Sequence, residues 1–79
     1  MLDLKVAKKV IGAKQTRRAV AAGEALTVYI AADAEARVIA PIRELCTQYG
    51  VTVAEVETMR ELGKACGIEV GAAVAAVTV

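Results

Sequence analysis

Residues 26–33 read LTVYIAAD, and this stretch decides the fold. Its apolar run is rich in β-branched and aromatic side chains and is too short for a helix, so it predicts a buried strand over Leu26–Ala32. Asp33 follows directly and is predicted to end the strand and to cap the next helix. A buried strand that leads into a helix is typical of an α/β protein.

The segment after this strand continues the alternation of helices and strands. Apolar residues recur every three to four positions over Ala34–Tyr49, which predicts a helix with a kink near Pro41. Gly50 ends this helix, and Val51–Val53 is predicted to be a second short strand.

The last third of the chain predicts one more helix and one more strand. A helix is expected over Thr58–Ala65, because Thr58 and Glu61 have the spacing of a capping box. The continuous apolar run Gly71–Val79 predicts a central strand that is buried on both faces.

Two helical patterns precede the strand at 26–32, and Gly12 separates them. The second pattern predicts a helix over Lys14–Ala22 that ends at Gly23. The first pattern predicts a helix from three apolar residues spaced four apart, namely Leu2, Val6 and Val10. The whole chain is therefore predicted to be a single domain over residues 1–79, a three-layer α/β/α sandwich whose small mixed sheet carries helices on both faces.

Composition excludes several classes of protein. The apolar fraction is 57% with no Phe or Trp, which predicts a core of small branched side chains. No apolar run approaches the roughly 20 residues that span a bilayer, so we expect a cytoplasmic protein without a membrane partner. Cys46 and Cys66 are expected to be buried reduced thiols, since two cysteines make no disulfide framework. With no histidine, no serine and no G-x-G-x-x-G, we expect no catalytic residue, metal or cofactor.

The formal net charge of +1 hides a polarised distribution. Residues 1–23 hold six bases against one acid, a balance of +5, whereas residues 24–57 hold two bases against six acids, a balance of −4. The remaining residues are balanced. This basic first third indicates a polyanion partner, although a solvated basic surface is the alternative.

The sequence GAKQTRR at residues 12–18 is the strongest candidate for such a contact. Gly12 would let a polyanion backbone come close, and the free amides of the following helix start attract anions. Lys14 and Arg18 are one helical turn apart, and Gln15 offers both a donor and an acceptor to a base edge. The alternative is an ordinary glycine C-cap followed by a solvated helix start.

A second unusual stretch is LGKACGIEVG at residues 62–71. Ile68 and Val70 are apolar residues in an apparent loop, where they could stack under an extruded base. The alternative is a loop that packs onto the core.

Both stretches resemble the kink-turn-binding superfamily of ribosomal protein L7Ae, in particular its short bacterial members of the YbxF and YlxQ type. The similarity covers nearly the whole chain and includes LGKACG at residues 62–67, GAKQTRR at residues 12–18 and AADAE at residues 31–35. It implies an α/β/α sandwich that binds kink-turn RNA, in which a short bulge adjoins tandem sheared G·A pairs.

The resemblance also implies a set of site residues. Lys14, Gln15 and Arg18 take the places of the Asn, Glu and Lys with which archaeal and eukaryotic members contact the G·A guanines, and Arg18 adds a planar fork. The extruded base would pack against Glu35 and Ile39 and against the loop at residues 68–70. The full expected RNA-binding set is Gly12, Lys14, Gln15, Arg17, Arg18, Glu35, Ile39, Lys64, Ile68, Glu69 and Val70.

The expected protein is thus a monomer that binds structured RNA containing a kink-turn, either ribosomal RNA or a riboswitch-like RNA. The alternative from another class is a protein-interaction adaptor of the same fold without specific RNA binding. That alternative predicts an exposed apolar patch and binding that survives high salt.

Overall fold

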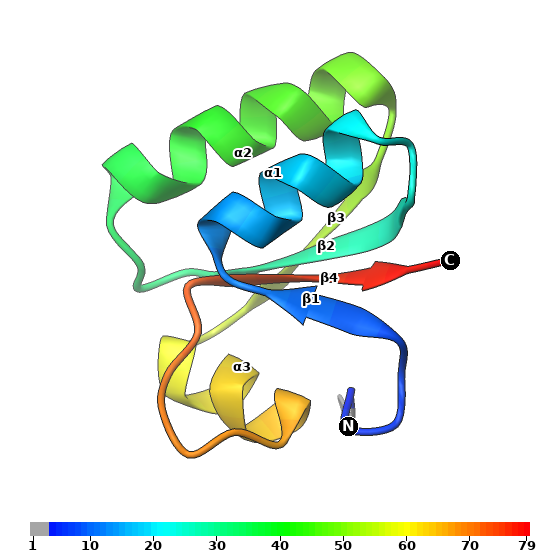
Figure 1. Cartoon of the computed structure of the whole chain (residues 1–79). Coiled ribbons are helices and arrows are strands. Elements are labelled where there is room, and N and C mark those ends of the chain that lie inside the picture. The colour runs from blue at the N-terminus through cyan, green and yellow to red at the C-terminus, as the bar shows by residue number, and fades with distance from the viewer. Residues whose placement is uncertain (1–3) are drawn as a thin grey trace.

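The computed structural model describes residues 4–79 and forms an α/β sandwich around one mixed sheet (Figure 1). The sheet has the strand order β1-β4-β2-β3, in which β4 runs antiparallel to β1 and β2, while β2 and β3 are parallel. The elements in chain order are β1 (Lys9–Ile11), α1 (Ala13–Ala21), β2 (Ala25–Ala31), α2 (Ala36–Tyr49), β3 (Thr52–Val56), α3 (Met59–Cys66) and β4 (Val74–Thr78).

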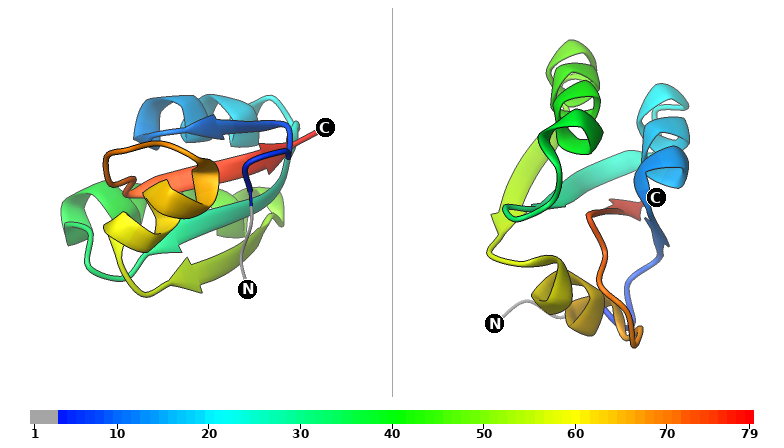
Figure 2. Two further views of the ribbon diagram at one scale, coloured as in Figure 1. Left: turned by 90° about the horizontal axis from the view of Figure 1, so that it is seen from below. Right: turned by 90° about the vertical axis from the view of Figure 1, so that its left-hand side faces the viewer.

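Helices α1 and α2 cover one face of the sheet and α3 covers the other, which confirms the predicted three layers (Figures 1 and 2). The run at the chain's end is confirmed as a central strand, because β4 lies between β1 and β2 and its residues 74–76 are fully buried. A strand that is covered on both faces has no polar side to present, which explains its continuous apolar sequence.

Two apolar clusters lie on opposite faces of the sheet. Side chains of β2 and β4 alternate between them, as the pleat requires. The cluster under α1 and α2 consists of Val20, Val28, Ile30, Ile39, Ile42, Cys46, Val74 and Ala76. The cluster under α3 consists of Leu4, Ala31, Leu62, Cys66, Ala72 and Ala75.

The two cysteines belong to different clusters, so the sheet separates them. Both are free and buried, as predicted. Burial raises the pKa of the Cys46 thiol, and it raises the pKa of the Cys66 thiol against an opposing effect of the Lys9 charge. A raised pKa leaves little thiolate near neutral pH, so both side chains act as small apolar core residues.

The predicted first helix is wrong. Its described part contains a strand, β1, which pairs with β4, and Val6 is 95% exposed instead of forming part of an apolar stripe. Val10 packs on one cluster and Ile11 on the other, which is the two-residue period of a strand. Hydrogen bonding to the distant strand β4 thus outweighs the helical spacing of the apolar residues. Leu2, the first residue of that pattern, lies outside the described residues.

The other elements lie near their predicted ranges. Helix α2 continues through Pro41, which lies exposed in its second turn, so the predicted kink does not interrupt the helix. Strand β3 extends to Val56, beyond the predicted end at Val53, because it pairs in parallel with β2 as far as Ala31. No helix within residues 4–79 is both long enough and apolar enough to cross a bilayer.

Thr16 is an exception in the core. It is fully buried on the inner side of α1, and its hydroxyl has no hydrogen-bond partner among the described residues. A buried hydroxyl without a partner lowers stability, because it has lost its hydrogen bonds to water.

The Thr16→Val substitution replaces this hydroxyl with a methyl group of similar shape. We expect the free energy of unfolding to rise by about 1 kcal/mol, measured by urea denaturation. Thr16→Ser is the control, since it keeps the hydroxyl and removes the methyl, and it should lower stability by about 1 kcal/mol. A clear loss of stability in Thr16→Val would contradict the conclusion that the buried Thr16 hydroxyl has no hydrogen-bond partner.

Candidate nucleic-acid interface

Three connecting segments meet at one end of the sheet. They are the β1–α1 junction at Gly12, the β2–α2 loop at residues 32–35 and the α3–β4 loop at residues 67–73, and the right-hand view of Figure 2 faces this end. The Gly12 amide donates to the Val74 carbonyl at 2.9 Å, and the Ala31 amide donates to the Ala73 carbonyl at 2.9 Å. The start of β4 therefore holds all three segments together, although they are far apart in sequence.

The start of α1 exposes backbone donors. Gly12 is the N-cap with φ of 102°, a conformation that favours glycine, and a Cβ there would meet nothing within 4 Å. No side chain within residues 4–79 caps the helix, and the first intrahelical bond runs from the Thr16 amide to the Gly12 carbonyl at 3.0 Å. The amides of residues 13–15 therefore have no partner within the helix and lie at the positive end of its dipole, which suits an anion.

The four basic and polar residues predicted on α1 are all exposed. Lys14 and Arg18 are one turn apart on a helix whose buried side is formed by other residues, so both project outward. Gln15 and Arg18 also line a concavity beside β1, whereas Arg17 is rotated from Arg18 by roughly 100° toward the side of Ala13. Lys14 and Arg18 therefore lie at the centre of the exposed side of the helix, with Gln15 on one flank, toward the concavity, and Arg17 on the other.

The β2–α2 loop carries two exposed acids, Asp33 and Glu35, whereas the predicted apolar residue Ile39 is mostly buried. Glu35 is the N-cap of α2 and forms an ion pair with Arg37 at 3.0 Å; because both side chains are mostly exposed, this pair contributes little to stability. Ile39 is only 8% exposed and belongs to the core under α1 and α2. It reaches the surface at the floor of a shallow concavity of about 320 Å³ that Ala32 and Ala34 also line.

The α3–β4 loop separates its two apolar residues. Val70 is 71% exposed, whereas Ile68 is partly buried against the cluster under α3. The Gly67 amide donates to the Lys64 carbonyl at 3.1 Å and the Ile68 amide to the Gly63 carbonyl at 3.0 Å, which together form a Schellman motif. Such a motif turns the residue after the glycine back onto the helix. The Gly67-Ile68 pair at the end of α3 is therefore the sequence signal for the partial burial of Ile68, and it was missed.

Gly63 allows this loop to lie against α3. A Cβ at residue 63 would come within 2.0 Å of the Val70 carbonyl oxygen, a backbone atom that cannot give way without moving the loop. Lys64 is exposed in the last turn of the same helix, where the dipole favours a cation, and Glu69 is exposed in the loop. The side chain of Val70 consequently projects from a loop whose backbone is held in place.

Asp33 does not cap α2, contrary to the prediction. Its Oδ1 accepts a hydrogen bond from the Met59 amide of α3 at 2.8 Å, and the Met59 carbonyl accepts one from the Ala72 amide at 3.0 Å. Asp33 thereby links the β2–α2 loop to the α3–β4 loop through the first residue of α3. Half of the predicted capping box is formed in α3: Thr58 Oγ1 accepts from the Glu61 amide at 3.0 Å, and within residues 4–79 the Glu61 side chain makes no return bond to the Thr58 amide.

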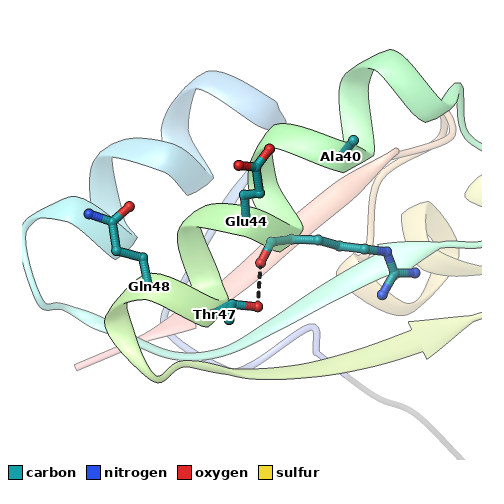
Figure 3. Close-up of a pocket in the computed structure, with 5 residues that line it drawn as sticks. Ala40, Glu44, Thr47 and Gln48 are labelled. Carbon is teal, nitrogen blue, oxygen red and sulfur yellow. Dashed lines mark hydrogen bonds between the residues drawn. The ribbon is translucent and has the colours of Figure 1, made fainter.

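A further concavity follows the outer side of α2 and includes Ala40, Thr47 and Gln48 (Figure 3). Figure 3 shows the Glu44 carboxylate projecting from this helix, and Thr47 Oγ1 donates to the Arg43 carbonyl at 3.0 Å. The residues that line this concavity include none of those predicted to bind RNA, so we do not assign it to the candidate interface.

Comparison with known proteins shows which family this chain is similar to. Residues 2–79 match the model of the Ribosomal protein L7Ae/L30e/S12e/Gadd45 family. The chain belongs to this family. The resemblance inferred from its motifs is thus confirmed.

Several members of the family named as RNA-binding proteins are similar to this chain. An RNA-binding protein of Caldanaerobacter subterraneus is 51% identical over 69 residues, which cover 87% of this chain and 84% of that protein. The RNA-binding protein YbxF of Geobacillus stearothermophilus is 45% identical over 74 residues, covering 94% of this chain and 90% of that protein. Both relatives carry the name RNA-binding protein, and this chain aligns with most of the length of each.

The fold is also shared with a solved structure. The 15.5kD RNA binding protein of Giardia lamblia superposes with a TM-score of 0.86 at 29% identity, and the similar region covers 91% of this chain and 61% of that chain. The match supports the α/β sandwich and the order of its layers.

The Asp33→Ala substitution tests the link between the two loops. Loss of the acceptor for the Met59 amide should lower the free energy of unfolding by about 1 kcal/mol and speed hydrogen exchange at Met59 and Ala72. Both effects are measurable by chemical denaturation and by NMR exchange. Asp33→Asn keeps an acceptor oxygen and should change both much less; equal exchange rates in Asp33→Ala and the unsubstituted protein would refute the link.

Proposed function

We propose that this protein recognises and stabilises kink-turns, in which tandem sheared G·A pairs adjoin a bulge with an extruded base. The observation that carries the proposal is the convergence of two unlike surfaces at one end of the sheet. The open amides and basic side chains of α1 lie beside the loop that exposes Val70. The start of β4 connects these two surfaces through its hydrogen bonds to Gly12 and Ala31.

In this proposal α1 contacts the G·A pairs. Arg18 and Lys14 donate to guanine O6 and N7, and Gln15 adds a donor or an acceptor to a base edge. The open amides after Gly12 bind a backbone phosphate. Arg17, on the flank of the helix, contributes charge to the same strand.

The α3–β4 loop contacts the extruded base in this proposal. Val70 offers an exposed apolar surface for stacking, with Glu35 and Glu69 as acceptors at its edges. Ile68 acts by supporting the loop from below, and Ile39 forms the apolar floor beside Glu35. Lys64 provides a charge next to the loop.

Binding of this kind acts by a population shift. A surface that contacts the G·A pairs and the extruded base together fits only the bent RNA, so its affinity for the bent state exceeds that for the extended state. We propose that the protein does this as a monomer and without catalysis, on cytoplasmic structured RNA such as ribosomal RNA or a riboswitch-like RNA. Residues 4–79 would act as one RNA-binding unit, associated with the ribosome.

Gel-shift titration against a kink-turn RNA and against the same RNA with its G·A pairs changed tests the proposal. We expect the change to weaken binding at least tenfold, because each lost bidentate base contact costs roughly 1–3 kcal/mol. Equal affinity for the two RNAs would rule out specific recognition.

The double variant Lys14→Gln and Arg18→Gln should weaken binding to the kink-turn RNA strongly. It should also reduce the slope of log affinity against log salt by roughly 1.5, because two phosphate- or base-directed charges are removed. Arg60→Gln is the control, since it removes an exposed charge from α3 on the other face of the sheet. If the control matches the double variant, the α1 surface is not the site.

A further inference from the structure

A groove separates α1 from the outer edge of the sheet. It has a volume of about 370 Å³, with Gln15 and Arg18 on its helical side and Lys8 at the entry to β1 on its other side. Its far end is lined by Glu24 and Val79. Since Gln15 and Arg18 also belong to the candidate interface, the groove continues that surface along the helix.

The charged lining of the groove is mainly basic. Lys8 and Arg18 are exposed, and the described residues offer neither side chain a hydrogen-bond or ion-pair partner. Lys9 also lines the groove, but its Nζ donates to the Lys5 carbonyl at 3.0 Å and to the Ala7 carbonyl at 3.4 Å. Lys8 and Arg18 are therefore the cations available to a ligand. Glu24 opposes Lys8 at the far end of the groove, because the Lys8 carbonyl accepts from the Thr78 amide and the Glu24 carbonyl accepts from the amide of the next residue, Val79.

The edge of β1 adds backbone donors to the same groove. The Gly12 amide bonds to Val74 and the Thr78 amide bonds to the Lys8 carbonyl, so the bonded positions on this strand are the even-numbered ones. The amides of Lys9 and Ile11 consequently point away from β4, at the open edge of the sheet. Such amides can donate to phosphate oxygens or to a ribose hydroxyl.

We propose that this groove binds the sugar-phosphate backbone of one RNA strand as it leaves the start of α1, with Lys8 as its phosphate contact and Arg18 at the boundary with the base-contacting surface. The inference rests on the proposed function and extends its footprint. Continuity with the α1 surface through Gln15 and Arg18 favours an RNA strand over an acidic peptide. Between Gln15 and Ala22 the helix rises roughly 10 Å, so the groove is long enough for a short stretch of backbone.

Salt titrations of binding with the variants Lys8→Gln and Glu24→Gln test the groove. Lys8→Gln should weaken binding to the kink-turn RNA and to its G·A-changed version by the same factor, and it should reduce the slope against log salt by roughly 0.7–0.9. Glu24→Gln should strengthen binding to both RNAs, because it removes the opposing charge. Both side chains are exposed, so the variants are expected to fold, which thermal unfolding checks.

The control Arg60→Gln removes one charge on the opposite face and should leave the slope unchanged. Failure of this inference is distinct from failure of the proposed function. If the unsubstituted protein does not discriminate between the two RNAs, kink-turn recognition fails, and the groove is still judged by the slopes. If it discriminates but Lys8→Gln has the slope of Arg60→Gln, or Glu24→Gln does not strengthen binding, the groove proposal is overturned.

Discussion

The central position of β4 is the constraint on which the rest of the molecule depends. The strand forms hydrogen bonds with β1 on one side and β2 on the other, and its residues 74–76 have no access to solvent. The first of these strands leads into α1 and the second into the β2–α2 loop. The carbonyls of Ala73 and Val74 hold both junctions, so the pairing that stabilises the sheet also builds the candidate interface.

Small side chains make this arrangement possible in a short chain. Ala75 and Ala76 face opposite clusters, so helices on both sides can approach the sheet closely. Gly63 likewise allows the α3–β4 loop to pack closely on α3, because a methyl group at this position would collide with the Val70 carbonyl. Close packing thereby holds in place the backbone of a loop whose exposed side chain, Val70, is free for contact.

The basic side chains in the first third of the chain have different surroundings in the structure. The α1 residues Lys14 and Arg18 project from a helix start with open amides, whereas the Lys9 ammonium is bound to backbone carbonyls. Lys8 lies beside a groove that Arg18 also lines. A count of charges in the sequence gives the sign of the surface, but only the fold shows which cations are available to a partner.

The sequence by itself determined the features that depend on neighbouring residues. The buried strand after residue 25, the Thr58 cap of α3 and the glycine-led start of α1 each follow from local propensity and hydrogen bonding, and they were predicted. The tertiary structure decided what depends on distant partners. Lys9–Ile11 became a strand because β4 lies beside it, and Asp33 bonds to Met59 of α3 instead of capping α2. The burial of Ile39 was in contrast encoded locally, because Ile39, Ile42 and Cys46 have the spacing of one helix face. The exposure of Val70 was decided by packing between elements, which the spacing of residues along its own loop does not encode.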